Sequence, residues 1–486
     1  MMPKNPINVW FFPLIGYCWL ASLASAQEYK GAACVIFVNH EIVLVRDMLS
    51  NRLSFPGGYL HSGEGPEQAA QRETYEETGL NVTVGPQLSQ ADRSAQYVCR
   101  SDTTIPILSR QGFEARAIVY ALSAPDFAKE IRQVYLIPPH SVTASELRFP
   151  HQINALPNFK HYPQWQSRAS LLQAQDIPIS KLHKIELEVI AQLQQWLAPQ
   201  ADLLFRVLNV LGENSLFFVL VPIIWAYAGW LVGLRCIALL ILSAELNTVL
   251  KVVFVQPRPF HLMPQLQRLE AYGFGLPSGH TLVATAIWGY CWYSFKHLLP
   301  TRYVRPGLGL LIVLLFGCGL ARVYWGVHFF SDVIVGAGLG LFLLCLFIRL
   351  ERTGRWDQIL LVKRLPWFIG FLLIAVTTFN TSGSLSIQLG GLTLGLYLGL
   401  CIDKTQVLQK KIAETGQSKY LLAGLGIIGI LLLDNAAKTI VSHEANSIIV
   451  MLVYFAFYLL IGLWLMMGMY LVLLCTKRNK SLQCNL

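Results

Sequence analysis

Charged residues are scarce in this chain. They make up 14% of its 486 residues, while 54% are hydrophobic; an average soluble domain is about 25% charged. This shortage excludes an ordinary soluble protein for the chain as a whole. It is also uneven, because residues 27–200 have the mixed polarity of a globular domain, whereas apolar runs recur from about Ser215 to Cys475. Each run is long enough to cross a hydrocarbon core of about 30 Å.

Acidic residues are also few. Asp and Glu total 28 against 38 Lys and Arg, which gives a formal net charge of +10. Such an excess can indicate nucleic-acid binding, but here the basic residues lie mainly in short loops between the apolar runs. That distribution is the one that orients membrane proteins, so we expect no nucleic-acid partner.

Cysteine is rare in the polar part of the chain, where residues 27–200 contain only Cys34 and Cys99. In an oxidising compartment the two could form a disulfide. Two buried thiols fit the sequence equally well, so the pairing stays open.

The first 26 residues have the pattern of a signal peptide. Lys4 lies near the start, an apolar middle follows, and Ala24-Ser25-Ala26 precedes Gln27. An uncleaved membrane anchor is the alternative. In both cases the N-terminus is expected inside and the segment from Gln27 onward outside.

The apolar runs predict nine membrane spans. They are expected at 215–233, 236–255, 281–299, 306–323, 329–349, 365–380, 384–402, 420–436 and 447–475. If the first span starts outside, most of the basic loop residues fall on the inner side, namely Arg235, Lys296, Arg302, Arg305, Arg349, Arg352, Arg355, Lys363, Arg364, Lys404, Lys410, Lys411, Lys419, Lys477, Arg478 and Lys480. The charge bias and the signal peptide thus agree that residues 27–200 lie outside, on the periplasmic side of a bacterial inner membrane. Residues 200–215 have apolar residues at helical spacing and predict either an interfacial helix or an ordinary linker helix.

The polar part begins with strand and turn signals. Residues 31–47 contain β-branched runs that predict two strands or a hairpin, and residues 55–65 predict a glycine-rich loop. Pro66 and Gly79 stand where a helix would begin and end.

On that helix, Glu73, Glu76 and Glu77 share one face. Three adjacent carboxylates repel one another, and a divalent cation with hard oxygen ligands, Mg²⁺ or Mn²⁺, removes the repulsion. Arg72 could hold one of the carboxylates in place. A solvated acidic helix face is the plain alternative.

These residues resemble the Nudix box almost completely. The matching positions are Gly58, Glu64, Arg72, Glu73, Glu76, Glu77, Gly79 and Leu80, and Thr74 is the one departure. The resemblance covers about residues 30–195 and implies an α/β/α Nudix fold that hydrolyses a diphosphate linked to another group. It implies that Glu73, Glu76 and Glu77 bind the metal together with a carbonyl at Gly58 and that one of them, with Glu73 taken as the catalytic residue, could act as base. It also implies that Arg72 and Glu64 support them. A domain that binds ligand without turnover is the alternative.

Three further stretches place charged residues where apolar runs meet the outer side. They are residues 251–259, 276–281 and 321–332. Ionisable groups at membrane depth are costly and mark functional sites. Among them Lys251, Arg258 and Arg322 are three cations without matching carboxylates nearby, which favours a phosphate ligand.

Two histidines complete this second pattern. His328 and Asp332 are four residues apart, so on one helix the carboxylate could accept a hydrogen bond from the imidazole and leave its other nitrogen nucleophilic. His280 opens the next expected span and could donate a proton to the leaving oxygen. Each histidine taken singly is more often structural.

The three stretches resemble the signatures of the type 2 phosphatidic acid phosphatase family, with Ala321 in place of the signature serine. The resemblance covers about residues 200–350 and implies a lipid phosphatase that needs no metal. It implies His328 as nucleophile, Asp332 as its orienting residue and His280 as acid. The implied phosphate-binding residues are Lys251, Arg258, Ser278, Gly279 and Arg322.

The sequence therefore predicts an α/β/α Nudix fold followed by an all-α membrane domain of about nine spans. The expected boundaries are 1–26 for the signal peptide, 27–200 for the Nudix domain, 201–350 for the phosphatase domain and 351–486 for further spans. Glu245 is expected either to neutralise a cation or to bond to a neighbouring helix. The last spans are expected to serve helix packing or a partner surface, with transport as a minority reading. The leading hypothesis is a bifunctional phosphohydrolase acting on a membrane lipid phosphate or diphosphate, with undecaprenyl diphosphate favoured. A phosphatase regulated by a non-catalytic Nudix sensor is the alternative, and the oligomeric state stays unknown.

Overall fold

The structure is a computed structural model that describes ten stretches of the chain, residues 29–91, 93–110, 116–152, 162–172, 177, 179–354, 364–381, 383–402, 419–444 and 446–473. The expected signal peptide lies outside the described residues, as do nine of the basic residues used for orientation, Lys4, Arg355, Lys363, Lys404, Lys410, Lys411, Lys477, Arg478 and Lys480.

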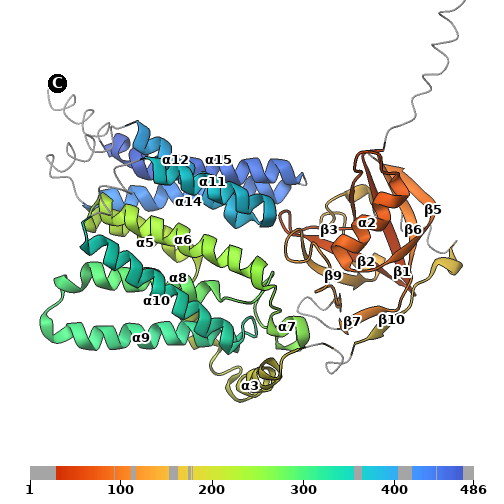
Figure 1. Ribbon diagram of the computed structural model, residues 1–486, viewed down its shortest axis with the longest axis horizontal. Coiled ribbons are helices and arrows are strands. Elements are labelled where there is room, and N and C mark those ends of the chain that lie inside the picture. The colour runs from red at the N-terminus through yellow and green to blue at the C-terminus, as the bar shows by residue number, and fades with distance from the viewer. Residues whose placement is uncertain are drawn as a thin grey trace, which may run out of the picture.

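The N-terminal part is a β-rich domain, residues 29–172, called the β domain below (Figure 1). Its strands are β1 (Gly31–Val38), β2 (Glu41–Asp47), β3 (Leu53–Ser54), β4 (Gly57–Tyr59), β5 (Val82–Ala91), β6 (Ser94–Ser101), β7 (Ile105–Ser109), β8 (Ala117–Val119), β9 (Ile131–Ile137) and β10 (Ala169–Leu171). They run in the order β10-β7-β8-β9-β2-β1-β6-β5, with β3 paired to β2 and β4 to β1. β1 and β2 form the antiparallel hairpin predicted for residues 31–47.

Cys34 in β1 and Cys99 in β6 form a disulfide. The two strands are parallel neighbours, which brings the cysteines together across 65 residues of sequence. Of the two alternatives left open by the sequence, the structure shows the paired one.

Helix α2 (Pro66–Thr78) begins and ends where the sequence predicts. Gly79 closes it with φ of 74°, a left-handed conformation that glycine adopts without steric cost. The expected loop over 55–65 is partly a strand, because Gly57 and Gly58 in β4 allow close pairing with β1. A Cβ at Gly57 would lie 2.3 Å from the carbonyl oxygen of Ala32. The sheet therefore fixes this segment beside α2.

The rest of the described chain is helical. The helices are α3 (Lys181–Leu197), α4 (Asp202–Val210), α5 (Asn214–Ala228), α6 (Trp230–Phe254), α7 (Pro259–Leu262), α8 (Gly279–Phe295), α9 (Thr301–Tyr324), α10 (Phe330–Arg352), α11 (Leu365–Thr381), α12 (Ser384–Cys401), α14 (Lys419–His443) and α15 (Ser447–Leu463). The helices from α4 onward are called the helical domain below. The predicted order, an α/β domain followed by a helical membrane domain, is confirmed.

The expected number of nine spans is not confirmed. Within the described residues six helices are long and apolar enough to cross a membrane, or seven if α4 and α5, bent by 45° at their junction, form one span. The difference comes from α5, α8 and α11, which contain 15, 17 and 17 residues and are short for a span.

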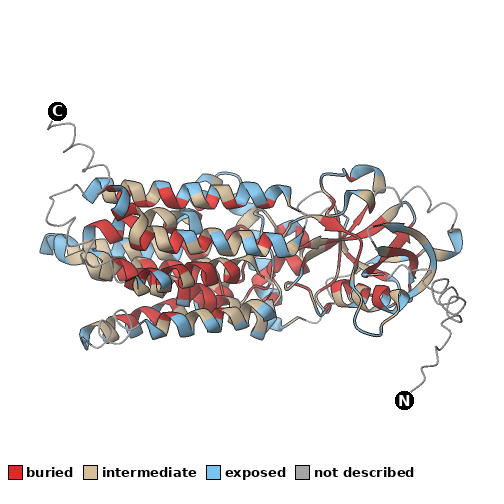
Figure 2. Cartoon of the chain, turned by 90° about the horizontal axis from the view of Figure 1, so that it is seen from above, coloured by how far each residue is buried: buried red, intermediate tan, exposed pale blue. Residues whose placement is uncertain are grey.

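In the helical domain, buried residues lie mainly on the inward faces of the helices and exposed residues lie on their outer faces (Figure 2). On α9, for example, Val313 is 65% exposed and Phe316 is 72% exposed. Apolar residues that face outward along a bundle are typical of contact with lipid. The same applies to α4, where Leu203 and Val207 are exposed, which favours the interfacial reading of residues 200–215.

The C-terminal helices share one hydrophobic core with the earlier ones. This core joins residues such as Trp225 of α5 and Leu343 of α10 to Leu396 of α12 and Ile461 of α15. The indole of Trp225 also donates a 2.6 Å hydrogen bond to the hydroxyl of Tyr470. Helix packing, one of the roles expected for the last spans, is thus observed.

Glu245 of α6 bonds to neighbouring helices. Its carboxylate accepts hydrogen bonds from Thr377 of α11 and Ser386 of α12. This is the second of the two alternatives derived from the sequence.

The β domain lies at one end of the helical bundle, and α3 lies near α7 at the lower edge of the view (Figure 1). Leu187 and Ile190 of α3 cluster with Leu266, Val323 and Phe329. Although the sequence placed α3 in the Nudix domain, its apolar face packs mainly on the helical domain.

Candidate active sites

The first candidate site is a cavity of about 520 Å³ in the β domain. All three carboxylates expected to bind metal, Glu73, Glu76 and Glu77, line it together with Gly58 and Arg72. The glutamates and Arg72 lie on α2, and Gly58 lies in β4, the glycine-rich strand beside that helix. The sequence-predicted residues are therefore gathered around one space.

Arg72 is the centre of an ion-pair network. Its guanidinium contacts the carboxylates of Glu64, Glu73 and Glu76 at 2.8 Å each. The hydrogen bond from Arg72 lowers the pKa of Glu64 to about 2. Arg72 thus fixes the acidic residues, the supporting part that the sequence suggested for it.

Two glycines set how closely the carboxylates approach the backbone. The Glu73 carboxylate lies against Gly58, where a Cβ would come within 2.4–2.5 Å of its atoms. The backbone N–H of Gly57 donates a 2.9 Å hydrogen bond to Glu77. Burial raises the pKa of Glu73 and raises that of Glu77 well above the usual carboxyl range.

Sequence reasoning missed three further acids that line the cavity, Asp47 in β2 and the pair Asp126 and Glu130. The pair lies close to α2. The backbone N–H of Asp126 donates to the carbonyl of Glu76, which anchors this segment to α2. Burial raises the pKa of both carboxyls of this pair. They lie in a loop without periodicity, so only their four-residue spacing could have drawn attention to them.

The donor set suits a divalent cation in type and charge. The cavity is lined by six carboxylates, from Asp47, Glu73, Glu76, Glu77, Asp126 and Glu130, against the two guanidinium groups of Arg72 and Arg148. Because Gly58 has no Cβ, the Glu73 carboxylate lies directly against its backbone, where the Gly58 carbonyl is the expected metal ligand. In the described parts of the chain, however, no three His, Cys, Asp or Glu side chains converge closely enough to form a finished metal cage.

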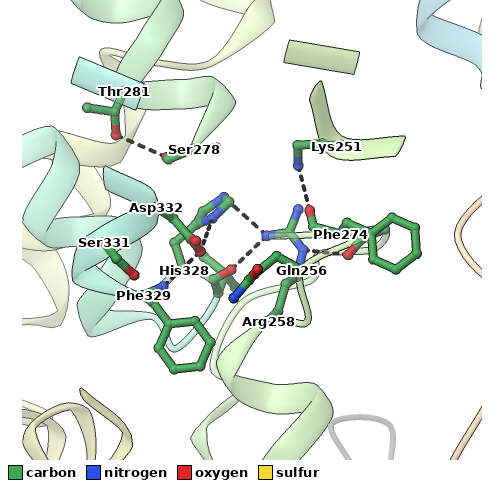
Figure 3. A network of polar contacts seen from close by, with 12 residues as sticks. Lys251, Gln256, Arg258, Phe274, Ser278, Thr281, His328, Phe329, Ser331 and Asp332 are labelled. Atoms are coloured by element: carbon green, nitrogen blue, oxygen red, sulfur yellow. Dashed lines mark hydrogen bonds and ion pairs between the residues drawn. The ribbon is translucent and has the colours of Figure 1, made fainter. Parts of the chain in front are cut away.

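The second candidate site lies at the end of the helical bundle that faces the β domain, and its centre is His328 (Figure 3). The Nδ1 atom of His328 is 3.1 Å from Oδ2 of Asp332, and both side chains are at most 2% exposed. The sequence placed both residues on one helix, which is wrong, because α10 begins at Phe330. Asp332 instead sits in the first turn and also accepts a hydrogen bond from the N–H of Phe329.

Arg258 contacts the opposite side of the imidazole. Its Nη1 lies 3.1 Å from Nε2 of His328 and donates to the carbonyl of Val327 at 2.7 Å. With Nδ1–H donating to Asp332, Nε2 of His328 carries the lone pair and accepts from Arg258. The predicted histidine and guanidinium groups are therefore brought into direct contact.

Lys251 and Arg258 both donate hydrogen bonds to one loop, residues 272–274. α6 ends at Phe254, before Pro257, so Arg258 lies beyond it. Lys251 Nζ donates to the carbonyl of Phe274 at 2.8 Å, and Arg258 donates to the carbonyls of Tyr272 and Gly273 (Figure 3).

Ser278, Gly279 and His280 open α8 as predicted, with Ser278 at its N-cap. A Cβ at Gly279 would lie 2.9 Å from the side-chain nitrogen of Asn247. Asn247, one turn before Lys251 on α6, thus packs on this helix start and was missed by sequence reasoning.

Arg322 and His280 have partners from the junction of α4 and α5, which sequence reasoning also missed. Arg322 Nη1 donates to Oδ1 of Asn209 at 2.8 Å, and Asn209 donates to Glu213 at 2.6 Å. Glu213 lies 3.3 Å from Nε2 of His280. The segment predicted as an interfacial or linker helix therefore supplies polar groups to the site.

The loop of Tyr272, Gly273 and Phe274 joins the two sites. The Phe274 side chain packs in the core of the β domain, 6.1 Å from the ring of Phe127. The guanidinium of Arg132 lies 4.0 Å from the centre of the Tyr272 ring. The segment that carries Asp126 and Glu130 in the first site thus holds the loop bonded to Lys251 and Arg258 in the second.

The two sites define a class of protein in which an apolar helical bundle carries a buried cluster of cations and histidines at one end, next to a domain with a carboxylate-lined cavity. Comparison with known families assigns both parts. Residues 28–157 match the NUDIX domain, and residues 229–356 match the PAP2 superfamily. The chain therefore joins a Nudix domain to a PAP2 superfamily domain.

Three curated relatives match parts of the chain. A probable sphingosine-1-phosphate phosphatase of Dictyostelium discoideum is 29% identical over 169 residues, 32% of this chain and 40% of the relative. Phosphatidylglycerophosphatase B of Bacillus subtilis is 32% identical over 142 residues, 27% of this chain and 66% of the relative. An undecaprenyl-diphosphatase of Sulfolobus acidocaldarius is 30% identical over 125 residues, 25% of this chain and 57% of the relative. The chain thus spans less than two thirds of the length of each of these relatives.

Proposed function

We propose that this chain is a bifunctional membrane phosphohydrolase. Its PAP2 site would remove a phosphate group from a membrane lipid phosphate or diphosphate, and its Nudix site would cleave a diphosphate linkage. The observation that carries the first activity is the contact series from Asp332 through His328 to Arg258. An imidazole, a carboxylate and a guanidinium are in contact at a buried position, which supports His328 as the nucleophile and Asp332 as its orienting residue.

The geometry supports a phosphohistidine mechanism. Asp332 holds Nδ1–H of His328, so Nε2 can attack phosphorus, and Arg258 is already positioned beside the atom that forms the new bond. Lys251 and Arg322 add positive charge for the phosphoryl oxygens. His280 donates a proton to the leaving oxygen, and water then hydrolyses the phosphohistidine.

Undecaprenyl diphosphate is the favoured substrate of this site. The support is the match to an undecaprenyl-diphosphatase together with two other relatives named as phosphatases of phosphorylated lipids. Because all three are similar over limited stretches, the substrate is proposed to be a lipid phosphate or diphosphate, with undecaprenyl diphosphate as the favoured member of that class.

At the Nudix site a bound Mg²⁺ or Mn²⁺ would neutralise diphosphate oxygens and lower the pKa of an attacking water. Glu73, Glu76, Glu77 and the Gly58 carbonyl would hold it. Arg72 keeps the carboxylates in place, and Glu73 is the proposed base that takes the proton of water. The signature, the cavity and the excess of carboxylates support this activity.

We place both sites on the periplasmic side of a bacterial inner membrane. The β domain and the PAP2 residues lie at the same end of the bundle, and the Cys34–Cys99 disulfide suits an oxidising compartment. The basic loops described above would then face the cytoplasm.

The experiment is a product-release screen of the purified full chain with lipid diphosphates, lipid monophosphates and nucleotide diphosphates, with and without EDTA. His328→Ala should abolish EDTA-resistant release, and Glu77→Gln should abolish Mg²⁺-dependent release. The matched controls are His297→Ala and Glu67→Gln, which change exposed residues. Retained activity in either active-site variant would refute the assignment of that site.

A second candidate function is a lipid phosphatase regulated by a Nudix domain that binds a ligand without cleaving it. The insertion of Phe274 into the β-domain core favours this function, because ligand binding near Asp126 and Glu130 could act on residues 272–274, called the PAP2 loop below. Mg²⁺-dependent turnover that Glu77→Gln removes would exclude this alternative.

A further inference from the structure

One wall of the Nudix cavity is formed by the helical domain. Ser447 and Met451 of α15 line the cavity opposite the carboxylates of α2. The two residues are four positions apart, so they lie on one face of the helix. The cavity is therefore completed by a segment for which the sequence predicted helix packing or a partner surface, with transport as a minority reading.

The β domain is fastened to both helices that meet at this wall. Arg148, which also lines the cavity, donates a hydrogen bond from Nη2 to Oγ of Ser447 at the start of α15. Arg52 donates a 2.8 Å hydrogen bond to the carbonyl of Ser442 near the end of α14. These contacts fix the mouth of the cavity against the end of the helical bundle.

The wall belongs to a segment with the character of a membrane span. α15 and its continuation form one helical run of 27 residues, Ser447–Leu473, which contains an 18-residue window with a mean hydropathy of 2.6. Beside the cavity wall, Ile448 is 63% exposed and Leu452 is 61% exposed. Exposed apolar side chains thus lie next to the cavity wall on the first turns of α15.

The cavity itself combines two kinds of surface. Its carboxylates suit a metal-bound diphosphate, while Met48, Leu49, Tyr59 and Met451 provide apolar or aromatic contacts. Apolar area buried against Met451 favours binding of a hydrocarbon chain.

We propose that the Nudix site acts on a diphosphate held in the bilayer by an apolar chain, with the chain leaving the cavity along α15. This inference rests on the proposed Nudix activity and names its substrate class. Water attacks one phosphorus of the phosphoanhydride, the bridging P–O bond breaks, and the proton of water passes to a carboxylate. For a lipid diphosphate the products are a lipid monophosphate and inorganic phosphate.

The product has a place in a reaction sequence. The lipid monophosphate stays in the same leaflet, and the PAP2 site lies at the same end of the bundle. The PAP2 site, proposed above to act on a lipid phosphate as well as a diphosphate, would then hydrolyse the phosphate ester of this product to the free lipid alcohol and a second inorganic phosphate.

The test uses the full chain carrying His328→Ala in lipid nanodiscs, so that the PAP2 site is silent. Undecaprenyl diphosphate in the nanodisc is compared with soluble ADP-ribose, and products are separated by chromatography with and without Mg²⁺. We expect kcat/KM for the lipid to exceed that for ADP-ribose at least tenfold. Met451→Gln should raise KM for the lipid about fivefold with little change in kcat.

Leu460→Gln is the matched control, because Leu460 is an exposed apolar residue of α15 nine positions beyond Met451. Equal or better cleavage of ADP-ribose, or an unchanged KM in Met451→Gln, overturns the lipid inference and leaves the Nudix activity intact. Absence of Mg²⁺-dependent cleavage of both substrates defeats the proposed Nudix activity and this inference with it. EDTA-resistant activity of Met451→Gln with His328 restored confirms that the variant is folded.

Discussion

At the scale of single residues, the two sites differ in how they treat charge. The Nudix cavity gathers carboxylates and neutralises some of them with Arg72, whereas the PAP2 site gathers cations and satisfies them with backbone carbonyls. An excess of negative charge suits a metal ion, and an excess of positive charge suits a phosphate. The chelator EDTA should therefore separate the two activities.

Gly58 tests the Nudix site at this scale. In Gly58→Ala the new methyl group would meet the Glu73 carboxylate at 2.4–2.5 Å, so Glu73 must move. We expect Mg²⁺-dependent turnover to fall at least a hundredfold, while EDTA-resistant phosphate release is unchanged. Gly65→Ala is the control, because its Cβ meets only the side chain of Gln68 at 3.8 Å. Equal losses in both variants would contradict the prediction.

Glu64 gives a prediction about pH. Its pKa in the folded chain is about 2, below its ordinary value of 4.5, because it accepts hydrogen bonds from Arg72. The ionised group therefore stabilises the folded state above about pH 4.5, and this contribution is lost as the pH falls toward 2.

For Glu64→Gln we expect a loss of about 1 kcal/mol of stability at pH 7, since the ion pair is partly exposed. The difference in unfolding temperature from the unsubstituted chain, followed by tryptophan fluorescence, should shrink as the pH is lowered below 4.5. Glu67→Gln, on the exposed side of α2, should show no such pH dependence. A difference that stays constant down to the acid end would contradict the assignment.

At the scale of elements, the break between α4 and α5 has a specific role. It brings Asn209 to Arg322 and Glu213 to His280. Gly212 allows this approach, because a Cβ there would lie 2.8 Å from the Cβ of His280. We therefore regard Asn209 and Glu213 as positioning residues for two of the proposed catalytic groups.

In Glu213→Ala we expect kcat of the EDTA-resistant reaction to fall about tenfold with little change in KM, because His280 loses its orienting partner. The pH profile of kcat should change at the same time, a result that a loss of packing alone would not produce. Arg206→Ala, on the exposed face of α4, is the control. An unaltered pH profile would argue against the positioning role.

At the scale of the whole molecule, the β domain and the helical domain share structural parts. Phe274 of the PAP2 loop packs in the β-domain core, and Ser447 and Met451 of α15 line the Nudix cavity. The helical domain thus contributes to both the core and the cavity of the β domain, so the two domains are interlocked and not joined by a linker alone.

Phe274→Ala tests this coupling. The ring is 6% exposed in the β-domain core, so its removal should loosen the loop whose carbonyl accepts from Lys251. We expect KM for a lipid phosphate at the PAP2 site to rise about tenfold. Phe149→Ala, which removes an exposed ring of the β domain, should leave it unchanged. An unaffected KM in Phe274→Ala would show that the loop is held without the β domain.

Much of this molecule follows from the sequence alone. The Nudix box and the three PAP2 stretches carry chemistry in short fixed spacings, and apolar runs reveal the helical part because a bilayer requires such lengths. Helix α2 begins and ends as predicted because Pro66 and Gly79 act through local backbone geometry. Local rules were therefore sufficient for the motifs and their order.

The tertiary structure decided what depends on contacts between distant segments. The pairing of Cys34 with Cys99, the start of α10 after His328, and the partners of Arg322 and His280 all come from elements far apart in the chain or from turns without a clear pattern. At the wall that α15 forms in the Nudix cavity, Arg148 is hydrogen-bonded to Ser447, a residue 299 positions away in the chain. No spacing rule reaches across that distance, because only packing of the β domain on the bundle brings Arg148 to Ser447.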